Sequence, residues 1–302
     1  MLPQGIYLFS DGLNDLAKPF PRSLDEKGDG WDVLRRNAND SKPVREAGLS
    51  FEAMPSDVPA PLFVCGECGS TMDVGAELLR LGLLPEWGGV ACLVQQSGRG
   101  QMRREWLSPQ GNLYLTLRWP DSPGGEWGRA DSGLQSVVLG WCVIRALEEL
   151  EVGLELKWPN DILQKGRKVA GILLEDRHGA LLAGVGVNLR SRPEDAQMRR
   201  DAACAAGVLL APGGAPSVPE LLALLVNRAK NIYESLIYDF SPREFLSLAE
   251  SRLAWMGREV LVREGEQPAS GGRVVGLNAD GGLVLTRNGV ESVVRSGSVS
   301  PV

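Results

Sequence analysis

A segment at residues 95–106, with the sequence QQSGRGQMRREW, carries the side chains best suited to binding an anion. Its three arginines present forked hydrogen-bond donors that suit phosphate or carboxylate oxygens, and its two glycines let backbone N–H groups approach the same ligand closely. Strands are expected on both sides, at 89–95 and 113–119, so the segment is a cationic loop held at both ends. The alternative is a solvated basic turn without a ligand.

A second segment joins polar side chains to an expected strand at 154–157. In Lys157-Trp158-Pro159-Asn160-Asp161 the proline stiffens a turn and fixes the direction of the two polar side chains that follow it. Lys168 then opens a strand whose apolar run, 169–174, indicates burial on both faces. A lysine at the mouth of such a strand indicates a site, although an ordinary strand-edge charge is the alternative.

A third segment, GVGVN at 184–188, has two glycines inside an expected strand at 181–189. Glycine in a strand interior is typical of places where a ligand or another backbone comes close. Asn188 should lie where this strand ends.

In this order and spacing, the GRG loop, the KWPND segment, the KxxGIL segment that begins at Lys168 and the GxGxN strand resemble the catalytic domain of biotin-protein ligases. The resemblance covers residues 62 to 302. It implies an enzyme, a biotin-[biotin carboxyl-carrier protein] ligase, that makes biotinyl-5′-AMP from biotin and ATP. The enzyme would then transfer biotin to a lysine of a biotin carboxyl carrier protein. ATP and Mg²⁺ are the implied cofactors, and biotin is the substrate.

The resemblance also implies roles for individual residues. Arg99, Arg104 and Lys168 are the implied catalytic cations. The implied biotin and adenylate pocket is lined by Ser70, Thr71, Gln95, Arg99, Gly100, Gln101, Trp106, Lys168, Gly171 and Gly184. The ATP and Mg²⁺ end is implied to involve Asn160, Asp161 and Asn188, without a direct structural metal site. Trp106 is expected to pack over the loop when the loop closes.

The chain departs from the family pattern at three positions. Met72 stands where the family has the asparagine of an S-T-N triplet, which removes a polar contact. Gln101 stands where an arginine is usual, and Arg103 where a glycine is usual. An amide lacks the charge-assisted, bidentate grip of a guanidinium, so adenylate retention should weaken unless Arg103 restores the charge. For Ser70 and Thr71 the alternative role is helix capping.

Two rival functions stay open. A lipoate or octanoate ligase or transferase shares the implied catalytic fold, and a biotin-binding regulator would keep the pocket without ligating. Residues 1–60 contain ten Asp and Glu against seven Lys and Arg and lack a recognisable winged helix, so nucleic-acid binding is not expected. The net charge of −6 points the same way. The role of residues 1–60, the identity of the carrier and the oligomeric state, including a homodimer, are left open.

The expected fold is α/β (α+β): residues 1–60 form an N-terminal extension, 61–254 a mixed-sheet catalytic domain like that of biotin and lipoate ligases, and 255–302 an SH3-like small β-barrel. Helices are expected at 31–37, 71–83, 131–150, 218–237 and 242–253, and the last two begin with capping boxes. Short strands separated by turns are expected at 259–263, 272–277, 283–286 and 290–294.

Composition supports cytoplasmic residence. The longest uncharged apolar-rich run, at 132–144, is shorter than the roughly 18 residues that span a bilayer. The N-terminus lacks a basic segment followed by an apolar one, and five cysteines do not describe a disulfide framework. Cys65 and Cys68 have C-x-x-C spacing, but with a single histidine and no second pair, buried strand cysteines are favoured over a zinc or redox site. The chain contains no P-loop motif, so ATP must be held in another way.

Overall fold

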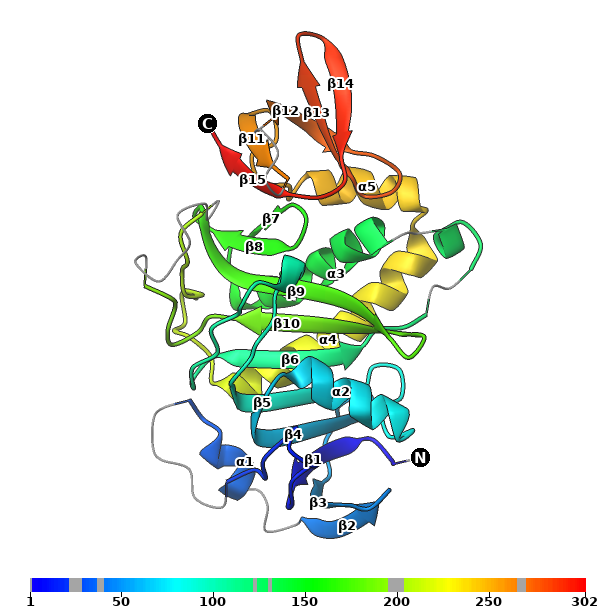
Figure 1. The fold of residues 1–302 in the computed structure, drawn as a ribbon, viewed down its shortest axis with the longest axis vertical. Coiled ribbons are helices and arrows are strands. Elements are labelled where there is room, and N and C mark those ends of the chain that lie inside the picture. Colours follow the sequence, from blue (N-terminus) through cyan, green and yellow to red (C-terminus); the bar gives the residue numbers. More distant parts are fainter. Residues whose placement is uncertain are drawn as a thin grey trace. The chain divides into compact units, whose positions relative to one another are not determined.

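The computed structural model describes residues 2–21, 29–36, 41–121, 124–129, 132–194, 204–264 and 270–302. The chain forms two compact units, in which distant segments come together (Figure 1). Unit 1 comprises Met1–Asp121, Ile172–Ser191 and Val208–Lys230, and unit 2 comprises Ser122–Gly171, Arg192–Gly207 and Asn231–Val302.

A mixed β-sheet forms the centre of unit 1, with the strand order β2-β3-β1-β4-β5-β6-β10. The strand β4 runs parallel to both of its neighbours, whereas β6 is antiparallel to β5 and β10. Helix α2 packs across β5, β6 and β10 through an apolar face. The bounds are β1 (Gly5–Phe9), β2 (Lys42–Glu46), β3 (Leu49–Met54), β4 (Pro61–Cys68), α2 (Thr71–Arg80), β5 (Gly89–Gln95), β6 (Leu113–Arg118) and β10 (Ala180–Val187).

Residues before 60 contribute more regular structure to unit 1 than the sequence indicated. The expected short helix is present as α1 (Asp32–Arg36), but the strands β1, β2 and β3 were not expected. They extend the sheet because β1 pairs with β4 on one side and β3 on the other. Aromatic contacts among Phe9, Phe51 and Phe63 join the three strands β1, β3 and β4. These strands are only five or six residues long, and the strands β1 and β2 lack clear alternation, which hides them from pattern analysis.

In unit 2, helix α3 (Ser132–Leu147) packs against the hairpin of β7 (Glu155–Lys157) and β8 (Asp161–Gln164). The hairpin pairs with the start of β9 (Arg167–Arg177), a strand whose residues from Ile172 onward belong to unit 1. The remaining helices are α4 (Val218–Asp239), also shared between the units, and α5 (Pro242–Glu250). Both expected capping boxes form, at Ser217 with Glu220 and at Ser241 with Glu244. The described part of the chain includes no helix with the length and hydropathy of a membrane span.

A second, five-stranded antiparallel sheet lies at the C-terminal end of the chain, with the order β14-β13-β12-β11-β15. Four of its strands were expected, and the fifth, β15, was not. Its apolar face packs around Trp158, whose indole N–H donates a 2.8 Å hydrogen bond to the carbonyl oxygen of Gly281. This contact explains why a turn carries a tryptophan. The bounds are β11 (Glu259–Arg263), β12 (Ser270–Leu277), β13 (Leu283–Arg287), β14 (Val290–Val294) and β15 (Ser298–Pro301).

Candidate functional site

A chain of side-chain hydrogen bonds crosses unit 1 where β5 ends and α2 begins. Thr116 Oγ1 donates to Thr71 Oγ1 at 2.8 Å, and Thr71 donates from both its backbone N–H and its hydroxyl to Gln95 Oε1, at 2.9 and 3.1 Å. Gln95 Nε2 donates to Ser108 Oγ at 2.9 Å, and Ser108 donates to the carbonyl oxygen of Trp106 at 3.0 Å. These hydrogen bonds therefore hold β5, β6, α2 and the end of the GRG loop together.

Ser70, at the start of the same helix, serves as its N-cap, because its hydroxyl accepts a hydrogen bond from the N–H of Met72. Its side chain is buried. The capping role foreseen as the alternative is thus present, and it fixes Ser70 beside Thr71 at one edge of the hydrogen-bond chain.

The cationic loop forms a narrow hairpin rather than an irregular turn. The N–H of Trp106 donates to the carbonyl oxygen of Gly98 at 2.8 Å, and that of Gly100 to the carbonyl oxygen of Arg104 at 2.7 Å. At the tip, Met102 has a φ of 57° and is 58% exposed. The expectation that the loop is held at both ends is confirmed. The side chain of Arg103 lies outside the described residues.

Gly98 is required by the close approach of the two sides of this hairpin. A β-carbon at that position would lie 2.6 Å from Ser108 Oγ and 2.9 Å from Gln95 Nε2, and closer still to the carbonyl oxygen of Trp106. Among the described residues, a β-carbon at Gly100 would meet only the carbonyl oxygen of Arg104, at 3.7 Å. The first glycine of the GRG motif therefore serves the loop itself, whereas the loop does not require a glycine at the second position in the same way.

Arg99 is held by a carboxylate of the neighbouring helix. One of its terminal nitrogens lies 2.7 Å from Asp73 Oδ1, and both side chains are about one-third exposed. The pair draws the loop arginine towards the first turn of α2. An incoming anion must compete with this carboxylate for the guanidinium.

The two glycines of β10 form a flat strip on one face of the strand, because residues two apart point the same way. A β-carbon at Gly184 would lie 3.2 Å from Met72 Sδ, and one at Gly186 would lie 2.7 to 2.8 Å from the indole of Trp106. Met72 and Trp106 therefore cover this glycine strip. Trp106 thus lies against the strand at Gly186 and Met72 against it at Gly184; that Trp106 packs over the loop when the loop closes stays a prediction.

Asn112, which the sequence did not single out, fixes the exit of β10. Its side-chain oxygen accepts hydrogen bonds from the N–H groups of Leu189, Arg190 and Ser191, at 2.8, 3.0 and 3.2 Å. Asn188, the preceding residue, is buried, and its carbonyl oxygen accepts from the N–H of Leu209. The backbone around Asn188 is thus held from both sides.

In unit 2, a carboxylate between two lysines is the central polar feature. Lys157 Nζ lies 2.7 Å from Asp161 Oδ2, and Lys168 Nζ lies 2.5 Å from Asp161 Oδ1. Exposure of the side chains rises along this triad, from 5% for Lys157 through 11% for Asp161 to 26% for Lys168. The lysine predicted to be catalytic is the outermost member.

A β-bulge places the three charges on the same face. Asp161 pairs with Lys157 in one direction and with Gly171 in the other, and paired residues point the same way. The register then shifts, so that Lys168 pairs with Leu163 and Val169 is the extra residue. Without the bulge Lys168 would face the opposite side of the sheet from Asp161.

Electrostatics in the triad keep Asp161 ionised. Burial raises the pKa of its carboxyl, but the charges of Lys168 and Lys157, together with hydrogen bonds from both, outweigh burial and lower the pKa to about 2. Burial also raises the pKa of the nearby Cys204 thiol, which is therefore neutral at physiological pH.

Cys65 and Cys68 are buried in the core of unit 1 together with Cys92, as expected for strand cysteines. All five cysteines of the chain are free. Mutual hydrogen bonding raises the pKa of Cys65 and lowers that of Cys68 to about 5. Within the described ranges, no group of three or more His, Cys, Asp or Glu side chains could hold a metal ion.

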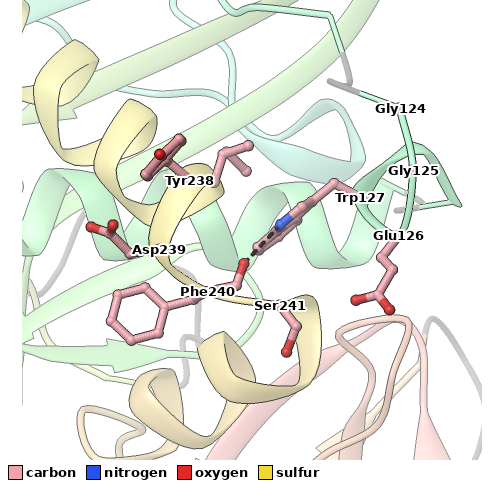
Figure 2. Close-up of a pocket in the computed structure, with 9 residues that line it drawn as sticks. Gly124, Gly125, Glu126, Trp127, Tyr238, Asp239, Phe240 and Ser241 are labelled. Atoms are coloured by element: carbon pink, nitrogen blue, oxygen red, sulfur yellow. Dashed lines mark hydrogen bonds between the residues drawn. The ribbon is translucent and has the colours of Figure 1, made fainter.

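The predicted site residues therefore fall into two sets, one in each unit. Unit 2 holds the triad lysine and aspartate together with Asn160 and Gly171. Unit 1 holds the other predicted residues, Ser70, Thr71, Gln95, Arg99, Gly100, Gln101, Arg104, Trp106, Gly184 and Asn188. A separate cleft in unit 2, lined by residues 124–127 and 237–241, contains none of them, and in it Trp127 Nε1 donates to the carbonyl oxygen of Phe240 at 3.0 Å (Figure 2).

Sequence reasoning missed Lys157, Asp73, Ser108 and Thr116, which contact predicted residues directly. Lys157 had a readable signal, since a hairpin centred on residues 158–160 places it opposite Asp161. Thr116, inside β6, and Ser108, in the loop before it, had none, because serine and threonine are common at such positions.

Comparisons with known proteins agree with this geometry. The sequence model of the biotin/lipoate A/B protein ligase family matches residues 68–191. A biotin--[acetyl-CoA-carboxylase] ligase of Paracoccus denitrificans is 32% identical over 224 residues, which span 71% of this chain and 91% of that protein. The bifunctional ligase/repressor BirA of Escherichia coli is 28% identical over 221 residues, 70% of this chain and 66% of that protein.

A crystal structure points to the same relatives. The biotin protein ligase of Aquifex aeolicus in complex with biotin and ATP superposes with a TM-score of 0.65 and 28% identity, and the match covers 79% of this chain and 97% of that one. Sequence motifs, near-complete coverage of a curated relative and the shared fold agree, and the chain belongs to the biotin protein ligases of the biotin/lipoate A/B protein ligase family.

Proposed function

We propose that this enzyme makes biotinyl-5′-AMP from biotin and ATP and transfers biotin to one lysine of a biotin carboxyl carrier protein. The observation that carries the proposal is the glycine strip of β10, which lies under Met72 and Trp106 and beside the cationic hairpin. Glycines in a strand allow a ring system to approach the backbone closely, and the adjoining cations suit a carboxylate and a phosphate. The relative from Aquifex aeolicus is described with biotin and ATP bound.

The reaction requires positioning and charge neutralisation rather than a protein nucleophile. A carboxylate oxygen of biotin attacks the α-phosphorus of ATP, the bond to the β-phosphate oxygen breaks, and pyrophosphate leaves. The amine of the carrier lysine then attacks the acyl carbon, loses a proton, and AMP leaves. We assign neutralisation of the phosphate charge to Arg99, Arg104 and Lys168, and close backbone approach to Gly100. Arg99 must exchange Asp73 for the ligand as it does so.

The residues predicted for Mg²⁺ do not fit a resident metal ion. Mg²⁺ prefers carboxylate oxygens, and Asp161 is the one carboxylate among the three predicted residues. Both of its oxygens are engaged by lysine ammonium groups. We propose that Mg²⁺ arrives with ATP, held by phosphate oxygens as part of the substrate, and that Asn160 and Asn188 contact the nucleotide by hydrogen bonds.

The proposal also assigns roles to the three parts of the chain and a cellular compartment to the enzyme. We assign catalysis to residues 61–254, carrier docking to the C-terminal sheet of residues 255–302, and a supporting role to residues 1–60, whose strands extend the sheet. Cytoplasmic work is supported by five free cysteines and by the need for ATP. A homodimer is an open option that size-exclusion chromatography with light scattering would test.

Lipoate or octanoate transfer is the second candidate, since the family name includes lipoate ligases. One assay separates the candidates: the protein is incubated with a biotin carrier domain or a lipoyl domain, MgATP, and biotin, lipoate or octanoate, and the intact mass of the domain is measured. We expect a biotin adduct on the carrier domain alone. A lipoyl or octanoyl adduct, or pyrophosphate release without any adduct, would overturn the assignment.

A further inference from the structure

Lys157 has no role in the mechanism above, yet it is a nearly fully buried cation in direct contact with Asp161. We propose that Lys157 is a positioning residue that occupies one oxygen of Asp161 and so leaves the outermost lysine, Lys168, able to attract the phosphates of ATP. This inference rests on the proposed function and deepens it.

The burial of the two lysines determines which of them an approaching anion meets first. Lys157 is paired with Asp161 across the β7–β8 hairpin, and its side chain is 5% exposed, so it cannot reach solvent or a ligand without unpacking. Lys168 is 26% exposed, and its backbone is fixed on the far side by hydrogen bonds to residues 205 and 207, at 2.9 and 2.8 Å. An anion approaching from solvent therefore meets Lys168 first.

Charge counting explains what the inner lysine does. Asp161 with Lys168 alone would be a neutral pair, and a carboxylate next to the cation would repel phosphate. With Lys157 bound to the other oxygen, the triad carries two positive charges and one negative charge, a net charge of +1. The carboxylate then orients Lys168 without cancelling the attraction of the site for a triphosphate.

Burial argues against a purely stabilising ion pair. Removing a lysine from water carries a large desolvation cost, and buried pairs can often be replaced by apolar residues without loss of stability. Apolar side chains in place of Lys157 and Asp161 together would serve the fold as well, whereas removing Lys157 alone leaves a buried carboxylate with one partner fewer. The ammonium group of Lys157 therefore acts through Lys168, the most exposed member of the triad.

The experiment compares Lys157→Met, Lys157→Arg and Lys157→Met combined with Asp161→Asn, with wild-type protein in parallel. ATP and biotin affinities are measured separately by titration calorimetry, and biotin-dependent pyrophosphate release gives KM and kcat. Lys157→Met should weaken ATP binding by about tenfold or more and leave biotin affinity unchanged. Lys157→Arg should restore most of the loss. The double variant, which returns the net charge to +1, should bind ATP better than Lys157→Met does.

Several results would overturn the inference. They are unchanged ATP affinity in Lys157→Met, an equal loss of ATP and biotin affinity with a lowered melting temperature, or a double variant that binds ATP no better than Lys157→Met. If Lys157→Met does not fold, Lys157→Arg and the double variant decide between the same outcomes. Failure of wild-type protein to release pyrophosphate with biotin would instead refute the proposed function, so the two failures are distinguishable.

Discussion

The two glycines of the GRG motif should respond differently to the same substitution. Gly98→Ala places a methyl group 2.6 Å from Ser108 Oγ, where ordinary contact begins at 3.4 Å, so the two sides of the hairpin must separate by 0.8 Å or more. Gly100→Ala places the methyl group 3.7 Å from its nearest neighbour, which is ordinary contact. The two variants carry the same substitution two residues apart in the same loop, and the positions differ in how closely the β-carbon is approached, so each variant is a control for the other.

The cost of Gly98→Ala has two parts. Overpacking costs about 1–3 kcal/mol, and loss of the hydrogen bond from Trp106 to Gly98 costs about 0.5–1.5 kcal/mol. Together they should lower the free energy of opening the hairpin by about 1.5–4.5 kcal/mol, with a smaller effect on the free energy of global unfolding because the loop can open alone. Displacing Ser108 also disturbs Gln95, so biotin affinity should fall.

Hydrogen exchange followed by mass spectrometry measures the opening directly, with urea denaturation as the global reference. Amides of residues 98–106 should exchange faster in Gly98→Ala and at the wild-type rate in Gly100→Ala. If a ligand approaches the second glycine closely, Gly100→Ala should weaken adenylate retention while the free loop stays intact. Equal exchange in the two variants would show that the hairpin contacts do not hold the loop, and the reasoning would be refuted.

Three further predictions concern the cations. Lys168→Ala should lower biotin-dependent pyrophosphate release by about 100-fold or more, because charge stabilisation is lost while Asp161 keeps its inner lysine. Near-normal release would refute the catalytic role of Lys168. Lys165→Ala, at an exposed position three residues away, is the control. Trypsin should cut after Arg103 or Arg104 in the free protein and be blocked by biotin with ATP, whereas equal cutting would show that the loop is not a lid. Arg103→Gly should speed release of biotinyl-AMP, and adding Gln101→Arg should slow it again; an unchanged dissociation rate in the single variant would exclude compensation by Arg103.

The part of the fold that the sequence predicted well is the part with strong local signals. The strand Gly89–Gln95 was placed to the residue, and both capping boxes were identified, because alternation and capping residues are local features. The strands β1 to β3 were missed because a sheet edge stabilises them through partners far along the chain. Their aromatic contacts join residues from three separate strands, and no window of sequence contains that information.

In the candidate site, too, contacts between residues far apart in the sequence could not be predicted from local patterns. Motifs predicted which residues carry charge, but the partner of each cation is set by tertiary structure. The sequence indicated no role for Asp73, yet it holds Arg99. The bulge at Val169 decides which face Lys168 occupies, and a bulge cannot be deduced from a run of apolar residues.

Two of the cations that we propose to bind ligand anions are paired with carboxylates. Asp73 holds the arginine of the hairpin, and Asp161 holds the lysine of the triad. Each arrangement keeps a cation in place without leaving it unpaired, so the side-chain ordering that binding requires is already done. The net free energy gained on binding is the difference between pairing the cation with a phosphate and pairing it with a single carboxylate. ATP carries several negative charges, whereas biotin carries one. The exchange should therefore favour the nucleotide at both cations, and biotin affinity should depend mainly on the glycine strip and the hydrogen-bond chain from Thr116 to Trp106.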